Sequence, residues 1–278
     1  MRRILLPTDF SENSLNAIDY AVELYKNIEC HFFLLNVQKS SEYIMDDLLG
    51  AHPDISVYDA IANDNKEQLA EVLSTYVTKS KNKGHHWHML FDFDVFIDAI
   101  KQAVISEKID LIIMGTNGAS GAKETLFGSN TLNVVRNVNC PTLMIPEGFM
   151  FKTLSSVLLS ATNCKDLKIE SVEILKNLAT THNTLIHVLN IHKEKNEPDH
   201  GYDFYLKNIF DNQTYKWYAL RGIPLPFAIE SFEQLIPVDM HAMFIKKESF
   251  LDRFFFGSKT LRVSYGTRIP LLLLPIVN

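Results

Sequence analysis

Small residues that suit a phosphate site gather near the middle of the chain, directly after a short apolar run. They are Gly115, Gly118, Gly128, Ser129, Asn130 and Thr131. Glycines beside a strand end let a backbone approach a ligand with no Cβ in the way. Free N–H groups and hydroxyls that open a helix lie at the positive end of its dipole, which favours anions. The stretch therefore predicts an anion site, most often one for phosphate.

The neighbouring elements would place these residues at one edge of a sheet. Leu111–Met114 has the composition of a strand covered on both faces, and Thr131–Asn137 continues as a helix. A first apolar strand, Arg2–Leu6, leads into the turn Pro7–Asp9. The carboxyl ends of parallel strands meet at the edge where open α/β folds bind ligands. Both groups of residues are therefore expected at the same edge.

The spacing G-x2-G-x9-G-S, which begins at Gly115, resembles the nucleotide-binding signature of the universal stress protein family. The segment Ile4–Ser11 is similar to the opening strand of that family and its ligand-contacting Asp. The resemblance implies an α/β, Rossmann-like fold of the adenine nucleotide alpha hydrolase type. It also implies that the chain binds ATP, or a related adenine nucleotide, without a dedicated catalytic apparatus. Mg²⁺ is expected only because polyphosphates commonly carry it.

The same resemblance implies roles for single residues. Asp9, in the wall formed with Pro7 and Thr8, would accept hydrogen bonds from ribose hydroxyls or the adenine amine. The backbone of Val37 would read the adenine edge, and Asn36 beside it stands where many members carry His. The ribose would be flanked by Met114 and Gly115. The phosphates would be cradled by Gly118, Gly128, Ser129, Asn130 and Thr131.

Other kinds of chemistry have weaker support. Taken alone, Pro7–Asp9 also fits an ordinary turn and Gly128–Ser129 an ordinary helix cap, and it is their joint spacing that favours a site. His86 and His88 would share a strand face and could bind metal, although partly exposed histidines explain them as well. The sequence has no Walker A loop and neither G-x-S-x-G nor H-E-x-x-H. With Lys123 the only lysine of the loop, we expect ATP hydrolysis to be slow at most.

Composition and charge narrow the class of protein. The 278 residues are 46% hydrophobic and 22% charged, which is typical of a soluble globular chain long enough for two domains. The net charge of −6 lacks the basic excess of a nucleic-acid binder. No run approaches the roughly 18 apolar residues of a membrane span, and no signal peptide is recognisable. Three cysteines without C-x-x-C fit a reducing cytoplasm.

Strands and helices alternate along the chain, and the pattern then repeats. A third helix is expected over Asp92–Ser106, and the whole alternation indicates two tandem, doubly wound parallel sheets. The sequence FGSNTLNVVRNVNCPTLMIP from Phe127 recurs as FGSKTLRVSYGTRIPLLLLP from Phe256, an offset of 129. The first strands are offset by 153, from Ile4 to Val157. The second copy should therefore be shorter, mostly between its second and third strands. These offsets place one domain at 1–148 and a degenerate one at 153–278.

The two copies differ where a ligand would bind. By the offset of 129, Gly115 becomes Phe244 and Gly118 becomes Lys247. Asp9 becomes Thr162, so the carboxylate is lost. We therefore expect the second copy to keep the fold but to bind no ATP in the manner of the family. For the third strands, the shared tryptophans predict that Trp87 and Trp217 are equivalent.

The last strand of each copy, Pro141–Ile145 and Pro270–Leu274, is apolar and bounded by prolines. In the resembled family the equivalent strand pairs across a two-fold dimer, which implies an intramolecular pseudo-dimer here, with a homodimer of chains also open. The favoured function is an ATP-binding sensor or regulator of stress response. Two alternatives stay open: an enzyme that slowly hydrolyses ATP or transfers adenylyl or phosphoryl groups, even to itself, and a partner-binding module with a vestigial site.

Overall fold

The computed structural model describes residues 1–38, 57–93, 95–116, 128–162, 167–192, 202–245 and 268–276. The elements of the first half follow the expected alternation. They are β1 (Arg2–Pro7), α1 (Glu12–Leu24), β2 (Cys30–Val37), α2 (Val57–Lys79), β3 (His85–Asp92), α3 (Phe96–Ser106), β4 (Leu111–Gly115), α4 (Ser129–Asn137) and β5 (Thr142–Ile145).

The described elements of the second half repeat this order. They are β6 (Ser156–Ala161), α5 (Ile169–His182), β7 (Leu185–His192), α6 (Tyr202–Ile209), β8 (Tyr215–Arg221), α7 (Leu225–Leu235), β9 (Met240–Ile245) and β10 (Leu271–Pro275). Between the second and third strands, α2 has 23 residues whereas α6 has 8. The second copy is therefore shortened where the two offsets predicted.

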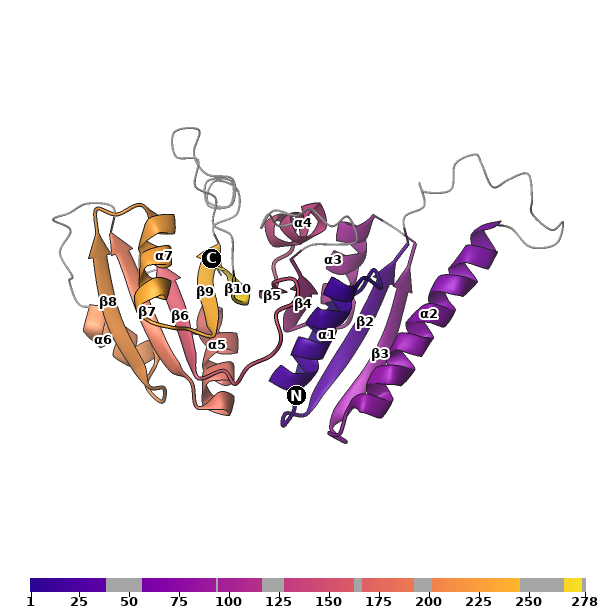
Figure 1. Ribbon diagram of the computed structural model, residues 1–278, viewed down its shortest axis with the longest axis horizontal. Helices are drawn as coiled ribbons and strands as arrows, with labels where there is room; N and C mark the ends of the chain where they lie inside the picture. Colours follow the sequence, from indigo (N-terminus) through magenta and orange to yellow (C-terminus); the bar gives the residue numbers. More distant parts are fainter. Residues whose placement is uncertain are drawn as a thin grey trace.

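The described strands form one ten-stranded sheet in the order β3-β2-β1-β4-β5-β10-β9-β6-β7-β8 (Figure 1). Neighbouring strands within each half are parallel, which confirms the expected α/β fold with a doubly wound parallel sheet in each half. At the centre, β5 and β10 are antiparallel, with Leu143 opposite Leu272. The expected pairing of the two terminal strands is therefore present within one chain, and we call this junction the seam.

Strand register shows which positions of the two halves are equivalent. Ile4 pairs with Phe32 and Leu111, and Val157 pairs in the same way with Ile186 and Met240. Leu111 and Met240 are thus equivalent, which reproduces the offset of 129. By the same register Gly115 and Phe244 are equivalent, because they pair with Ile145 and Leu274.

Register corrects one of the expected matches. Phe32 pairs with Trp87, and its equivalent Ile186 pairs with Tyr215, so Trp87 is equivalent to Tyr215 rather than to Trp217. The match through the two tryptophans was wrong by two residues. A shift of two leaves every side chain on the same sheet face, so the apolar pattern could not reveal it.

The start of the third helix also differs from expectation. Asp92 is the last residue of β3 and pairs with Val37, and its carbonyl oxygen accepts the N–H of Gln38 at 2.9 Å. Helix α3 begins at Phe96, and its N-cap Val95 makes no side-chain cap. Acidic residues are favoured at N-caps, so the sequence suggested a helix start where the ladder with β2 continues instead.

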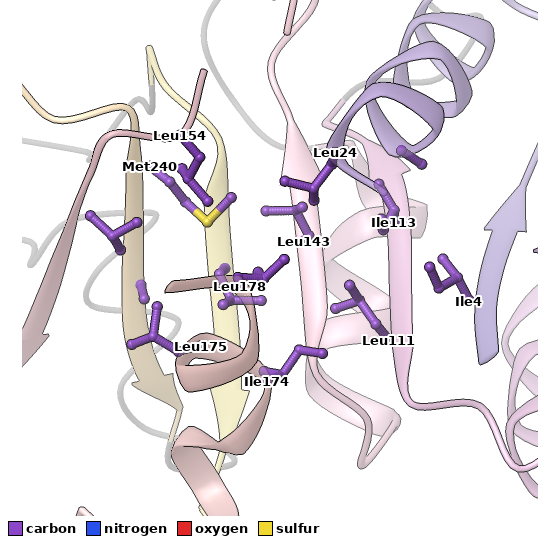
Figure 2. Packing of buried hydrophobic residues seen from close by; sticks show 14 of the residues in the cluster. Ile4, Leu24, Leu111, Ile113, Leu143, Leu154, Ile174, Leu175, Leu178 and Met240 are labelled. Carbon is purple, nitrogen blue, oxygen red and sulfur yellow. The ribbon is translucent and has the colours of Figure 1, made fainter. Parts of the chain in front are cut away.

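One hydrophobic core runs across the seam. It includes Leu24 of α1, Leu143 of β5 and Leu178 of α5, all almost fully buried (Figure 2). Helices α1 and α5 thus cover the same face of the sheet on either side of the seam. They also touch directly, since His182 Nε2 lies 2.9 Å from the carbonyl oxygen of Leu24. Burial of these side chains from both halves should couple the stabilities of the halves.

Candidate functional site

The turn after β1 is held by hydrogen bonds centred on Thr8, which is buried. Its N–H donates to the carbonyl oxygen of Leu35 at 2.8 Å, and its hydroxyl lies 2.9 Å from Ser14 Oγ. The same hydroxyl oxygen accepts the N–H of Phe10 at 3.0 Å. Buried Pro7 ends β1 directly before it. Thr8 therefore fixes the path of the chain at the carboxyl end of β1.

Asp9 follows at the surface of this turn. Its Oδ1 accepts hydrogen bonds from the N–H of Ser11 at 3.2 Å and from Ser11 Oγ at 2.5 Å. Ser11 is also the N-cap of α1, because its Oγ accepts the N–H of Ser14 at 3.3 Å. Between them, Phe10 has φ of 62°, a left-handed backbone that is rare for a bulky residue. The carboxylate is thus held, exposed, at the edge of the sheet.

The end of β4 is tied to the start of α4. The N–H of Gly128 donates to the carbonyl oxygen of Thr116 at 2.7 Å. The hydroxyl of Thr131 reaches back to the carbonyl oxygens of Gly115 at 3.1 Å and Thr116 at 3.2 Å. These bonds fix the direction in which the helix begins.

The N-terminus of α4 has the properties of an anion site. Its N-cap, Gly128, has no side chain to accept the first N–H groups, and the first turn holds no acidic residue. Ser129 and Asn130 are exposed there, whereas Thr131 is buried. Gly128 has φ of −60°, which any residue can adopt, so its small size rather than its backbone freedom is what a ligand could use. First-turn amides without a side-chain acceptor favour a bound anion.

Gly115 has a role inside the chain that the sequence did not reveal. A Cβ placed on it would lie 2.6 Å from Nδ2 of Asn13, which is buried in the first turn of α1. The absence of a side chain therefore lets α1 approach the end of β4. Asn13 was missed because nothing in the local pattern distinguishes it from an ordinary residue of a helix start.

The remaining expected residues lie around the same edge. Met114 is buried in β4, and half-buried Val37 ends β2. Because β1 pairs with both β2 and β4 in parallel, the carboxyl ends of all three strands meet there. Gly118, Lys123 and Lys247 lie outside the described residues. The structure thus brings the turn at Asp9, the end of β4 and the start of α4 to one edge.

Asn36 is a second residue whose role the sequence did not predict. Its side chain is 5% exposed, and its Nδ2 donates to the carbonyl oxygen of Thr8 at 2.8 Å. It lies one residue before Val37, near the end of β2. A polar residue directly after the apolar run Phe32–Leu35 was the available signal, because buried polar groups usually have a defined hydrogen-bonding role.

At the equivalent edge of the second half the residues are of another kind. Phe244 is half-buried and packs against the shared core at the position of Gly115. Thr162, in the position of Asp9, is exposed. In β6, the Oγ of Ser160 lies 2.7 Å from Nε2 of His241, whose Nδ1 is 3.7 Å from Oε1 of Glu233.

Serine, histidine and a carboxylate in this order resemble a nucleophile, a base and an orienting group. Burial argues against that role, since Ser160 is 3% and His241 0% exposed. Desolvation lowers the pKa of His241 to about 3, so its ring is neutral near pH 7. Ser160 and His241 therefore form a buried polar pair in the sheet, which faces the partly exposed carboxylate of Glu233 on α7.

Three histidines lie together on β2 and β3. The ring of His31 stacks on His86 and on His88, with centroid distances of 4.8 and 4.9 Å, so His86 and His88 share a face as expected. Desolvation lowers the pKa of His31 and of His88, and their closeness adds to the shift in His31. Among the described residues, no group of three metal-ligating side chains could hold an ion.

Comparisons with known proteins agree with this architecture. The crystal structure of a universal stress protein from Archaeoglobus fulgidus superposes with a TM-score of 0.71 at 20% identity, over 99% of this chain and 98% of that one, which shows the same fold across both halves. Within the described residues, no helix is long and apolar enough to cross a membrane.

Sequence relatives match about half of the chain. Universal stress protein MJ0531 of Methanocaldococcus jannaschii is 27% identical over 146 residues, which cover 52% of this chain and 82% of that protein. Universal stress protein MJ0577 of the same organism is 29% identical over 153 residues, or 52% of this chain and 94% of that protein. The model of the universal stress protein family matches residues 1–146, and the chain therefore belongs to this family.

Proposed function

We propose that the chain binds one adenine nucleotide, ATP, at the edge formed by β1, β2, β4 and α4, and acts as a sensor or regulator in stress response. The observation that carries this proposal is the start of α4. Its first amides have no side-chain acceptor from the N-cap, and its first turn lacks acidic residues. An aligned helix N-terminus of this kind suits a phosphate.

The proposed contacts follow from the arrangement of the edge. Asp9 accepts hydrogen bonds from the ribose hydroxyls or the adenine amine, and the Val37 backbone reads the adenine edge. The ribose lies against Met114 and Gly115, beside the wall of Pro7 and Thr8. The phosphates, with Mg²⁺ where present, lie against Gly118, Gly128, Ser129, Asn130 and Thr131. Gly118 enters this set from the sequence alone.

One nucleotide per chain is proposed because the second half differs at equivalent positions. Thr162 offers no carboxylate in the place of Asp9, and the ring of Phe244 stands in the place of Gly115. We further propose that 1–148 and 153–278 are the two domains, and that they occupy the places of two subunits in a pseudo-dimer. The antiparallel pairing of β5 with β10 supports this arrangement.

The residue types at the proposed site favour binding of ATP without efficient catalysis. Asp9 is the only ionisable residue among the proposed contacts, and in the proposed site its carboxylate binds the ribose or the adenine amine rather than the phosphates. A general base needs a free acceptor within reach of the attacking group. We therefore propose that bound ATP is retained rather than turned over quickly.

Calorimetry with matched variants tests the proposal. ATP should bind with a stoichiometry of one per chain, and Asp9→Ala should weaken binding by about tenfold or more, the worth of a charge-assisted hydrogen bond. Thr162→Ala, the equivalent change in the second half, should leave the affinity unchanged. Two nucleotides per chain, or equal effects of the two variants, would overturn the proposed site.

Mass spectrometry of the protein after incubation with ATP tests the mode of action. Intact bound ATP is the expected result. Free ADP or AMP produced at rates above about 1 per second, the low end of ordinary enzymes, would favour an enzyme instead. A modified chain would indicate transfer of a phosphoryl or adenylyl group to the protein itself.

A further inference from the structure

The peptide bond that leads into Asp9 is held from the neighbouring strand. The carbonyl oxygen of Thr8, which belongs to the peptide group directly before Asp9, accepts the Nδ2 hydrogen of Asn36 at 2.8 Å. Asn36 is 5% exposed and comes from β2, whose residues up to Leu35 pair with β1. The bond therefore joins the end of one strand to the first residue of the turn after another.

Packing alone does not account for an asparagine at this position. The Oδ1 of Asn36 is buried and makes no hydrogen bond to any of the described residues. An amide with one of its two ends unsatisfied is costly to bury, and an apolar residue of similar size would avoid that cost. The side chain points to the same sheet face as Phe32 and Leu34, both core residues. Its particular contribution is the bond to Thr8.

The turn that this bond holds would not keep its shape unaided. Phe10 has φ of 62°, and a bulky residue holds such a backbone only where its surroundings fix it. The part of the turn that leads into α1 is held by the Thr8 hydroxyl, which accepts the N–H of Phe10, and by the Asp9 carboxylate, which accepts the hydroxyl of Ser11. The part of the turn that follows β1 is held by Asn36. Without it, the Thr8–Asp9 peptide could rotate and carry the carboxylate away from its position.

The second half supplies an internal comparison. Asn190 is equivalent to Asn36 by register and is 0% exposed, and its Oδ1 likewise has no hydrogen-bond partner in the part of the chain that the structure describes. Its Nδ2, however, lies 2.8 Å from Nε2 of His192 on its own strand. In that half the equivalents of Thr8 and Asp9 are Ala161, the last residue of β6, and Thr162. An asparagine is thus present in both halves, but its described bond reaches the turn only in the half that has the carboxylate.

We infer that Asn36 is a positioning residue, which orients Asp9 toward the ribose of the bound nucleotide by holding the Thr8 carbonyl. This inference rests on the proposed function. It predicts that Asn36 controls recognition of the ribose hydroxyls rather than of the phosphates.

The test compares affinities for ATP and for 2′,3′-dideoxy-ATP, measured by calorimetry. The two ligands share base and triphosphate, so their affinity ratio isolates the ribose hydroxyls. The wild-type chain should prefer ATP by about tenfold, as expected for hydrogen bonds to a carboxylate. Asp9→Ala should bring the ratio close to one. Asn36→Leu should do the same, although the new side chain would touch no ligand, whereas the matched variant Asn190→Leu should keep the wild-type ratio.

Further variants separate positioning from packing. Asn36→His restores a ring N–H donor and should recover most of the preference for ATP, whereas a folded His variant that discriminates no better than Asn36→Leu would count against the inference. Asn36→Val, with a strand-forming side chain that lacks a donor, replaces Asn36→Leu if circular dichroism shows that variant unfolded. The double variant D9A/N36L should lose no more of the ratio than D9A alone, because the two residues act through one contact.

The failures of the two claims are distinguishable. If Asp9→Ala reduces the ratio and Asn36→Leu does not, the positioning role is wrong and the nucleotide site stands. If the wild-type chain does not bind ATP, the proposed site is itself wrong, and the role of Asn36 falls with it. If ATP binds but Asp9→Ala leaves the ratio unchanged, Asp9 does not contact the ribose, and the positioning role of Asn36 is wrong while the nucleotide site stands.

Discussion

The carboxyl edges of the two half-sheets differ far more than the sheets themselves. Both halves have the same strand order, and register makes Ile4 equivalent to Val157 and Leu111 to Met240, all of them buried. At the edges, Gly115 is replaced by Phe244. The comparison indicates that the residues of the core and those of the ligand edge can change independently of one another. Apolar burial maintains the core in both halves, whereas the described groups that we propose to bind a nucleotide lie at the edge of the first half.

The halves are nevertheless not independent bodies. The seam places Leu143 opposite Leu272, and the core around them draws side chains from α1 and α5 alike (Figure 2). The two halves therefore differ at their edges although they share one hydrophobic core. Four measurements test this comparison.

The largest effect is expected at the seam. Leu143→Ala removes a fully buried side chain from the shared core and should lower the free energy of unfolding by about 2–5 kcal/mol. Each half contains one of the two tryptophans, Trp87 in β3 and Trp217 in β8, so fluorescence reports on each half separately. In urea unfolding of Trp87→Phe and Trp217→Phe backgrounds, Leu143→Ala should shift both signals. A Trp217 transition that does not move would show that the halves unfold independently. Leu235→Ala, at a side chain 81% exposed, is the control.

Lowering the pH should reveal a difference in stability that arises from His241, whose equivalent in the first half is Ile112. The folded pKa of His241 is lowered to about 3 by burial, from an ordinary value of 6.5. Below pH 6.5 the unfolded chain binds a proton at His241 that the folded chain does not bind. The contribution of His241 to the free energy of unfolding is therefore constant above pH 6.5 and decreases as the pH is lowered further. This histidine should contribute a loss of about 1.4 kcal/mol per pH unit until about pH 3.

The double variant S160A/H241I tests that slope. It replaces both hydrogen-bond partners by apolar residues, which leaves no buried polar group unsatisfied at this pair and can be nearly neutral for stability at pH 7. Urea unfolding between pH 7 and pH 4 should show that the variant loses less stability than the wild-type chain. Parallel curves would contradict the assignment, because the other histidines are common to both proteins.

Exchanging the residues at the ends of β4 and β9 tests the edges directly. Gly115→Phe should abolish ATP binding and cost about 1–3 kcal/mol of stability, because even a Cβ at this position meets Asn13 at 2.6 Å. The reverse change, Phe244→Gly, should create no second nucleotide site, since Thr162 supplies no carboxylate. Calorimetry and thermal melting measure the two effects. ATP binding that survives Gly115→Phe would show that the ligand does not approach this strand end.

The smallest effect concerns helix caps. Ser11 accepts the N–H of Ser14 at the start of α1, whereas the N-cap of α5 is Lys168, whose side chain makes no cap. Lys168 is exposed and has ψ of 150°, as an N-cap requires. Lys168→Ser should therefore raise the free energy of unfolding by up to about 1 kcal/mol, and Ser11→Ala should lower it by about as much. Thermal melting at pH 7 would contradict the first expectation if Lys168→Ser melted below the wild-type chain.

Much of the fold could be predicted from local pattern and internal repetition. Apolar runs such as Leu111–Met114 identified strands, and the recurrence of Phe127–Pro146 as Phe256–Pro275 identified the two copies. The two offsets also located the shortened connection that holds α6. The resemblance to a family added the pairing of β5 with β10, which periodicity within either strand could not give.

The predictions from the sequence that were wrong or incomplete each have a local cause. Asp92 suited a helix N-cap, but its backbone continues the ladder with Val37. Trp217 resembled Trp87 in type and face, yet stands two residues from the equivalent position. The glycine signature located an edge, while the reason for Gly115 includes a neighbour in α1, Asn13, that no spacing in the sequence indicates.

By itself, the sequence determined which segments form strands and helices, which face of each is apolar, and that the unit occurs twice. These features depend on residues a few positions apart, and periodicity records them. Only the tertiary structure decided that Asn36 holds the turn before Asp9, that His241 lies buried beside Ser160, and that one core spans the seam. Such contacts join residues far apart in the chain, and their geometry arises only when the strands have taken a register and the helices have packed on them.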